Sequence, residues 1–183
     1  DPSRWQPLIH EGRIQRWIIP HWENVTPFAL TAADQFMPSP PAPVKSGAFR
    51  RQVQEVIGIQ ADLTDRQKVI AEFWADGPSS EFPPGHWSTI AQYVSRSRGL
   101  TLDDDVKLFF LVANAVFDAS IGAWAAKIHY DYVRPVSAVR YLKQGKKIRA
   151  WTGPGRGTGV IDGEAWVPYQ VASFRTPPFA EYV

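Results

Sequence analysis

The chain has 183 residues and a formal net charge of +2, and it is 44% hydrophobic and 21% charged. This is the composition of an ordinary globular domain with room for a sizeable core. The small net charge argues against a nucleic-acid-binding or membrane-surface protein, because either would need a clustered basic patch. The absence of cysteine excludes disulfides and thiolate metal sites. No run approaches 18 apolar residues, so no membrane-spanning segment is expected.

Residues 1–47 are predicted to form an irregular arm. Tryptophans and prolines alternate without a regular period over residues 1–32, which is typical of an extended segment anchored by its aromatic side chains. Four prolines in residues 36–47 indicate a linker in polyproline or turn geometry. We therefore expect the packed core to begin near residue 48.

Helical patterns follow one another over residues 48–150, the predicted helical core. The expected helices cover residues 47–58, 64–75, 86–98, a long stretch from 101 through at least 124, and 135–143. Thr64 and Gln67 form a capping-box start, Gly99 is a stop signal, and Pro135 suits the first position of a helix. No alternating strand of convincing length is present, so the predicted fold class is all-α.

From Trp151 onward the chain is rich in glycine and proline. The run from Gly153 to Gly159 lacks the Gly-Lys-Ser/Thr ending of a phosphate-binding loop, and no strand is expected before it. Residues 151–183 are therefore predicted to be a loop, and the run from Gly153 to Gly159 within it is predicted to be a flexible loop rather than a nucleotide site.

Two permanent cations, Lys127 and Arg134, lie seven residues apart at the end of the longest helical pattern. On a continuous helix they would share one face, since seven residues make about two turns. Asp131 between them leaves open an ordinary solvated charge ladder. However, apolar neighbours indicate partial burial, and Pro135 disfavours the helical conformation for Arg134 and places it at a helix junction. The alternative is therefore an oxyanion site formed by the two cations.

Lys127, six intervening residues and Arg134-Pro135 resemble the first signature of a known superfamily. Its members are type 2 phosphatidic acid phosphatases, bacterial acid phosphatases and vanadium-dependent haloperoxidases. Further segments resemble the haloperoxidase branch: Trp124, Thr176 to Val183, Asp76-Gly77 with Pro83-Pro84, Asp118-Ala119 and Pro20 to Phe28. The resemblance covers most of the chain from about residue 70. It implies a helical bundle of the vanadium haloperoxidase and acid phosphatase type.

The end of the sequence is also informative within this resemblance. In the superfamily, a run like Pro177 to Tyr182 is followed by a Ser-Gly-His motif, an arginine and a second histidine. The sequence stops at Val183, where that motif should begin. The resemblance therefore implies that residues 1–183 are one incomplete helical domain. The vanadate-ligating histidine is expected outside this chain, in the remaining C-terminal half of the same protein.

The resemblance also implies a role for individual residues. Lys127 and Arg134 would be the catalytic and vanadate-binding residues, with vanadate as the cofactor. Trp124 and Phe179 match positions that line the halide pocket, although core packing remains an alternative for both. Asp76 matches an aspartate that pairs with the arginine of the missing half, although a helix-terminating Asp-Gly turn has the same signature.

The implied function is that of a vanadate-dependent haloperoxidase. Such an enzyme oxidises bromide or chloride with hydrogen peroxide to a hypohalous species, which halogenates small organic substrates. A soluble acid phosphatase that acts through a phosphohistidine outside this chain, and a non-catalytic helical domain, remain open. The histidines of the chain have no metal-ligand spacing, so no direct metal ligand is expected here. Secretion or a periplasmic location, and possible homo-oligomerisation, are further expectations.

Overall fold

The computed structural model describes residues 1–170 apart from residues 8, 11, 12, 15, 78 and 79. The chain forms two compact units. The first unit comprises Asp1–Arg16, Pro40–Gly77 and Asp131–Val183, and the second comprises Trp17–Ser39 and Pro78–Tyr130. Each unit has its own packing and is described by itself. The prediction of one incomplete domain over residues 1–183 stays a prediction.

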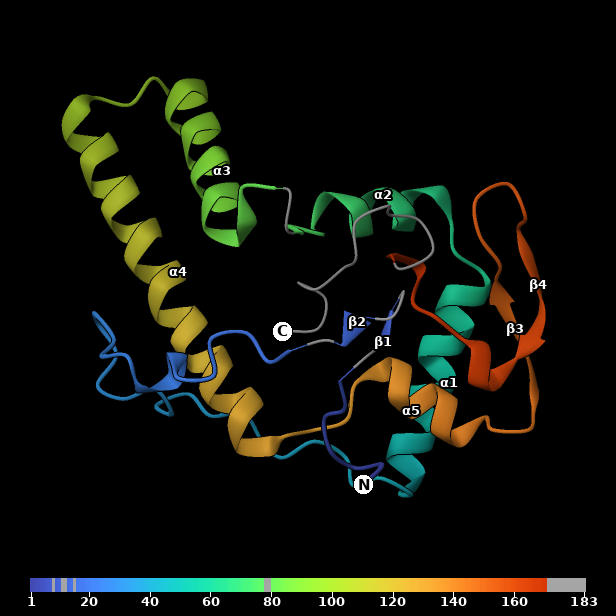
Figure 1. The fold of residues 1–183 in the computed structure, drawn as a ribbon. Coiled ribbons are helices and arrows are strands. Elements are labelled where there is room, and N and C mark those ends of the chain that lie inside the picture. The colour runs from blue at the N-terminus through green and yellow to red at the C-terminus, as the bar shows by residue number, and fades with distance from the viewer. Residues whose placement is uncertain (8, 11–12, 15, 78–79, 171–183) are drawn as a thin grey trace. The chain divides into compact units, whose positions relative to one another are not determined.

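The described residues are mostly helical, which confirms the predicted fold class (Figure 1). The helices are α1 (Gly47–Ala61), α2 (Asp65–Phe73), α3 (Phe82–Arg98), α4 (Leu102–Tyr130) and α5 (Pro135–Leu142). Thr64 and Gln67 form the predicted capping box: the Thr64 N–H donates to Gln67 Oε1 at 2.9 Å, and the Gln67 N–H donates to Thr64 Oγ1 at 3.3 Å. Gly99 ends α3 in the left-handed conformation, with a φ of 59°.

Two short hairpins were not predicted. They pair β1 (Ile9–His10) with β2 (Arg13–Ile14), and β3 (Lys147–Trp151) with β4 (Thr158–Asp162), both antiparallel. Two 3-10 turns, η1 (Trp22–Asn24) and η2 (Gly163–Ala165), complete the elements. The prediction of a flexible loop over residues 153–159 was therefore wrong in part, because this segment closes a hairpin. The Thr152 N–H donates to the Gly157 carbonyl at 2.8 Å, and glycine permits the positive φ of 66° at residue 157.

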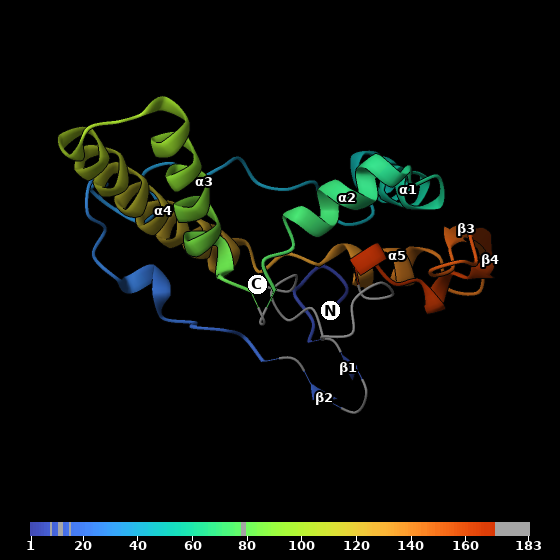
Figure 2. The same ribbon diagram turned by 90° about the horizontal axis from the view of Figure 1, so that it is seen from above.

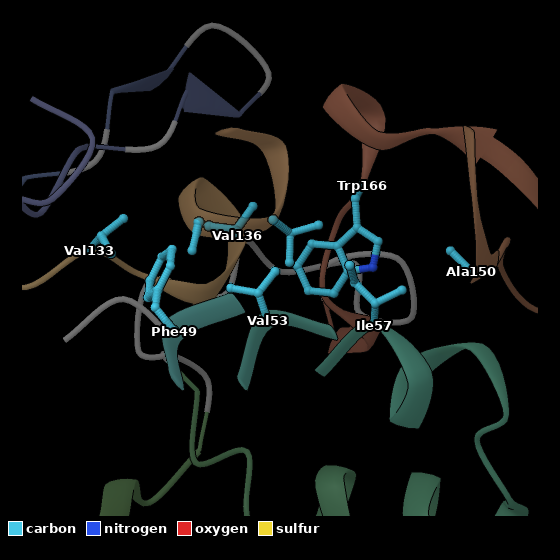
Figure 3. Packing of buried hydrophobic residues seen from close by; sticks show 9 residues of the cluster. Phe49, Val53, Ile57, Val133, Val136, Ala150 and Trp166 are labelled. Atoms are coloured by element: carbon cyan, nitrogen blue, oxygen red, sulfur yellow. The ribbon is translucent and has the colours of Figure 1, made fainter. Parts of the chain in front are cut away.

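The core of the first unit lies between α1, α5 and the residues after β4 (Figure 3). Phe49, Val53 and Ile57 are spaced by four residues, so they lie on one stripe of α1 and face the rest of the cluster. Val133 and Val136, at 5% and 2% exposure, pack in the same cluster. The core is completed by Ala138, Val139, Ala150 and Trp166. Val133 comes from the segment that joins α4 to α5, and Val136 comes from the first turn of α5, so the end of this segment is fixed in the core.

The second unit is built on α3 and α4, which run side by side in both views of the chain (Figures 1 and 2). An aromatic residue of the arm anchors on α4, as predicted: Trp22 Nε1 donates to Ser120 Oγ at 2.8 Å, and the Trp22 ring meets Phe117 edge-on. Asp118, which is buried in α4, clamps the next part of the arm. Its carboxylate accepts the backbone N–H groups of Phe28, Ala29 and Leu30 at 2.6, 2.7 and 3.0 Å.

This clamp makes the stability of the second unit sensitive to acid. Burial raises the pKa of the Asp118 carboxyl, but the three N–H donors outweigh burial and hold its pKa below the usual value. A lowered pKa contributes stability above the ordinary carboxyl value of about 3.9, and that stability is lost as the pH falls through the lower folded value. We therefore expect Asp118→Asn to lower the free energy of unfolding at neutral pH, and the deficit to shrink in acid.

Urea unfolding of the full-length protein at several pH values measures this effect. Asp34→Asn, at an exposed residue of the same unit, is the matched control and should change little. A deficit for Asp118→Asn that stays constant or grows as the pH falls would contradict the clamp.

The expectation that no segment spans a membrane stays a prediction, and helix α4 is the element that bears on it. Most of its charged residues lie near its two ends, so residues 108–126 contain a single charge, Asp118. By length and composition α4 could cross a membrane, but a single such helix is weak evidence because core helices of soluble proteins pass the same test. Only 17% of the most apolar 18-residue stretch of α4 is buried by the part of the chain that the structure describes. Much of the apolar surface of α4 is therefore exposed in the second unit.

Candidate functional site

Arg134 lies at a helix junction, as predicted from the proline that follows it. Helix α4 ends at Tyr130, and Arg134 has extended backbone angles (φ −77°, ψ 152°) as the N-cap of α5. Pro135 occupies the first turn of α5 and disfavours a helical Arg134. The expectation that Lys127 and Arg134 share one face of a continuous helix was therefore wrong.

The backbone on both sides of Arg134 is held in the core of the first unit. Val133 and Val136 are 5% and 2% exposed, and Tyr132 packs edge-on against Phe49 while its hydroxyl donates to the Ala42 carbonyl. The Arg134 side chain itself is partly buried. A guanidinium carried by a fixed backbone loses less conformational entropy when it binds an anion than one on a mobile loop.

Arg134 also lines a cavity of about 360 Å³ within the first unit. Most of the other lining side chains are apolar, among them Val56, Ile59, Leu63 and Trp166. Apolar walls lower the local dielectric constant, and this strengthens the attraction between a cation and a bound anion. The cavity therefore places a permanent positive charge beside a space of ligand size.

Asp131 forms an ion pair with a residue that lies far from it in the sequence. Arg4 Nε donates to Asp131 Oδ2 at 2.5 Å, so the carboxylate forms an ion pair with the N-terminal arm. The Trp5 N–H donates to the Asp131 carbonyl at 3.0 Å, and the Val133 N–H donates to the Ser3 carbonyl at 3.1 Å. Sequence reasoning missed this contact because Arg4 and Asp131 are 127 residues apart.

Lys127 lies in the last turn of α4, in the second unit, and is partly buried. Its Nζ lies 4.3 Å from the ring centroid of Trp124, in a cation–π contact. Trp124 is held in turn by a hydrogen bond from its Nε1 to the Ile18 carbonyl, at 3.1 Å. The spacing of three residues between Trp124 and Lys127 brings the two side chains together on α4.

The remaining predicted site residues lie elsewhere or outside the description. Asp76 lies three residues after the end of α2 and has a φ of 41°. Its pairing with an arginine of the missing half stays a prediction. Phe179 lies outside the described residues. Among residues 1–170, less the gaps given above, no group of three His, Asp or Glu side chains could hold a metal ion.

Comparison with known proteins supports the resemblance to vanadium-dependent haloperoxidases. A family model described as "VCPO second helical-bundle domain" matches residues 107–183, which include Lys127 and Arg134. The fold is similar to that of an apo-type bacterial vanadium-dependent chloroperoxidase, with a TM-score of 0.77 and 28% identity over 91% of this chain and 40% of that chain. The holo-type bacterial enzyme matches with a TM-score of 0.73 and 26% identity, over 91% of this chain and 39% of that chain.

A bacterial vanadium-dependent iodoperoxidase is also similar, with a TM-score of 0.65 and 30% identity over 77% of this chain and 37% of that chain. No curated protein matches the chain. These matches support the assignment of the chain to the vanadium haloperoxidase superfamily. It spans about 40% of the length of the solved chloroperoxidase chains.

Proposed function

We propose that the whole protein is a vanadate-dependent haloperoxidase, and that this chain supplies Lys127 and Arg134 of its oxyanion site. The enzyme would oxidise a halide with hydrogen peroxide to a hypohalous species that halogenates organic substrates. One observation carries the proposal: Arg134 is a partly buried cation on a fixed helix junction, beside a mostly apolar cavity, in a chain similar to vanadium-dependent chloroperoxidases.

The side chains present suit an oxyanion such as vanadate. Arg134 offers a planar fork of N–H donors that can bind two oxygens of one oxyanion, and Lys127 offers a second positive charge. When bound, vanadate would supply a Lewis acid that activates hydrogen peroxide towards halide. The resemblance implies that the ligand to vanadium itself would come from the remaining polypeptide.

Trp124 supports the role proposed for Lys127. The cation–π contact restricts the lysine side chain, and the hydrogen bond to Ile18 fixes the indole. A fixed ammonium group needs little reorganisation when negative charge develops near it. Trp124 would also form one wall of the halide pocket, and Phe179 would form another.

The exposed apolar surface of α4 supports a further polypeptide partner. Only 17% of its most apolar window is buried among the described residues, and soluble proteins rarely leave large contiguous apolar patches exposed. The solved relatives are more than twice as long as the part this chain matches. We therefore propose that the remaining C-terminal half packs on α4 and completes the oxyanion site.

An activity assay of the full-length protein tests the proposed function. The protein is prepared without vanadate and incubated with hydrogen peroxide, a phenol and chloride, bromide or iodide in separate reactions. We expect halogenation of the phenol only after orthovanadate is added. Hydrolysis of a phosphomonoester that orthovanadate inhibits, without halogenation, would instead identify a phosphatase. Absence of both activities would identify a non-catalytic domain.

A further inference from the structure

A short N-terminal segment, Ser3–Trp5, lies along the three residues that precede Arg134. We call this segment the strap. Two backbone hydrogen bonds join it to the chain, from the Val133 N–H to the Ser3 carbonyl at 3.1 Å and from the Trp5 N–H to the Asp131 carbonyl at 3.0 Å. These two hydrogen bonds flank an isolated antiparallel β-bridge between Arg4 and Tyr132. The strap therefore contacts the segment that carries the proposed oxyanion-binding arginine.

The ion pair between the strap and Asp131 has an electrostatic consequence for that site. The Asp131 side chain is only 29% exposed, so solvent screens its negative charge weakly. Asp131 precedes Arg134 by three residues on a backbone that is extended at Arg134. Three residues of extended chain span about 10 Å, and over this distance a weakly screened carboxylate repels an oxyanion bound at Arg134. Arg4, with its Nε 2.5 Å from Asp131 Oδ2, offsets this charge.

We propose that Arg4 is a positioning residue of the oxyanion site, which neutralises Asp131 and thereby strengthens oxyanion binding at Arg134. The inference rests on the proposed function, since it assumes that Arg134 binds the oxyanion. The alternative is a purely structural tether, in which the ion pair only holds the strap in place. The two roles make opposite predictions for variants that remove the Asp131 charge.

Substitutions at these positions should leave the fold intact. The Arg4 side chain is 66% exposed, so its truncation removes little packing. Asp131 has a positive φ of 40°, and asparagine has the same shape and tolerates this left-handed conformation. Asp131→Asn therefore removes the charge without a new backbone strain. The two backbone hydrogen bonds of the strap remain in both variants.

The experiment is an orthovanadate titration of the full-length protein, prepared without vanadate and followed by calorimetry. We expect Arg4→Ala to weaken binding on the order of fivefold at low salt, and less at high salt. Asp131→Asn should bind orthovanadate as well as the wild type or better. The double variant should recover wild-type affinity, because it no longer contains the repelling carboxylate, and Arg4→Lys should remain close to the wild type.

Two results would overturn the inference alone. The first is that Arg4→Ala binds orthovanadate as tightly as the wild type, while Arg134→Ala shows that wild-type binding depends on Arg134. The second is an Asp131→Asn protein weakened as much as Arg4→Ala, without recovery in the double variant, which is the behaviour of a structural tether. A wild-type protein that binds no orthovanadate would overturn the proposed function and this inference together.

Discussion

Replacement of Arg134 by alanine is expected to lower kcat/KM for halide oxidation by the full-length protein about 10²- to 10³-fold, the usual loss for one strong oxyanion donor. The side chain is partly buried beside the apolar cavity, so water compensates poorly for the lost guanidinium. Arg134→Lys keeps the charge but loses the planar fork, and we expect an intermediate loss. Steady-state kinetics at saturating orthovanadate, together with an orthovanadate titration, measure both effects.

Arg149→Ala is the matched control for Arg134. Arg149 belongs to the same unit, and its exposed side chain pairs with Asp62 at 3.1 Å, away from the cavity lining. Its removal should change kcat/KM less than twofold, in line with the small contribution of exposed ion pairs, about 0–1 kcal/mol. Similar activities for Arg134→Ala and Arg149→Ala would exclude Arg134 from the site.

Lys127→Gln is expected to reduce kcat/KM by about 100-fold. Glutamine keeps an N–H donor on a side chain that is one atom shorter, but it loses the positive charge and the cation–π contact with Trp124. The loss should therefore appear in orthovanadate affinity and in turnover. Kinetic measurements with excess orthovanadate separate the loss of affinity from the loss of turnover. Excess orthovanadate compensates for weaker binding, but it does not restore a slower turnover.

Lys107→Gln controls for charge removal from the same helix. Lys107 is exposed near the start of α4, about five and a half turns before Lys127. It should leave kinetics and affinity unchanged. A Lys127→Gln enzyme with full activity would show that the lysine has a packing role only, with its stem against Trp124.

Local sequence signals predicted the helices well because those signals act within one turn. Helix α2 begins at the hydrogen bonds between Thr64 and Gln67, and α3 ends at the left-handed conformation of Gly99. Pro135 predicted the junction at Arg134 for the same local reason. The β3–β4 hairpin was missed because Lys147 to Trp151 is only five residues long, although its alternation, with Ala150 buried, is a strand signal.

Long-range contacts of the candidate site could not be predicted from sequence. The Arg4–Asp131 ion pair joins residues 127 positions apart, and no local pattern indicates it. Asp118 is different, since a single carboxylate within the apolar residues 108–126 of a helix predicts a buried partner. The partner, three N–H groups at residues 28–30, becomes visible only in the folded chain.

The most direct test of the central claim is a crystal structure of the full-length protein with orthovanadate bound. We expect one oxyanion with both Lys127 Nζ and the Arg134 guanidinium within hydrogen-bond distance of its oxygens, about 3 Å. The strap residue Arg4 should still pair with Asp131 in that structure. An oxyanion bound without Lys127 and Arg134, or the two cations at separate sites, would contradict a shared oxyanion site.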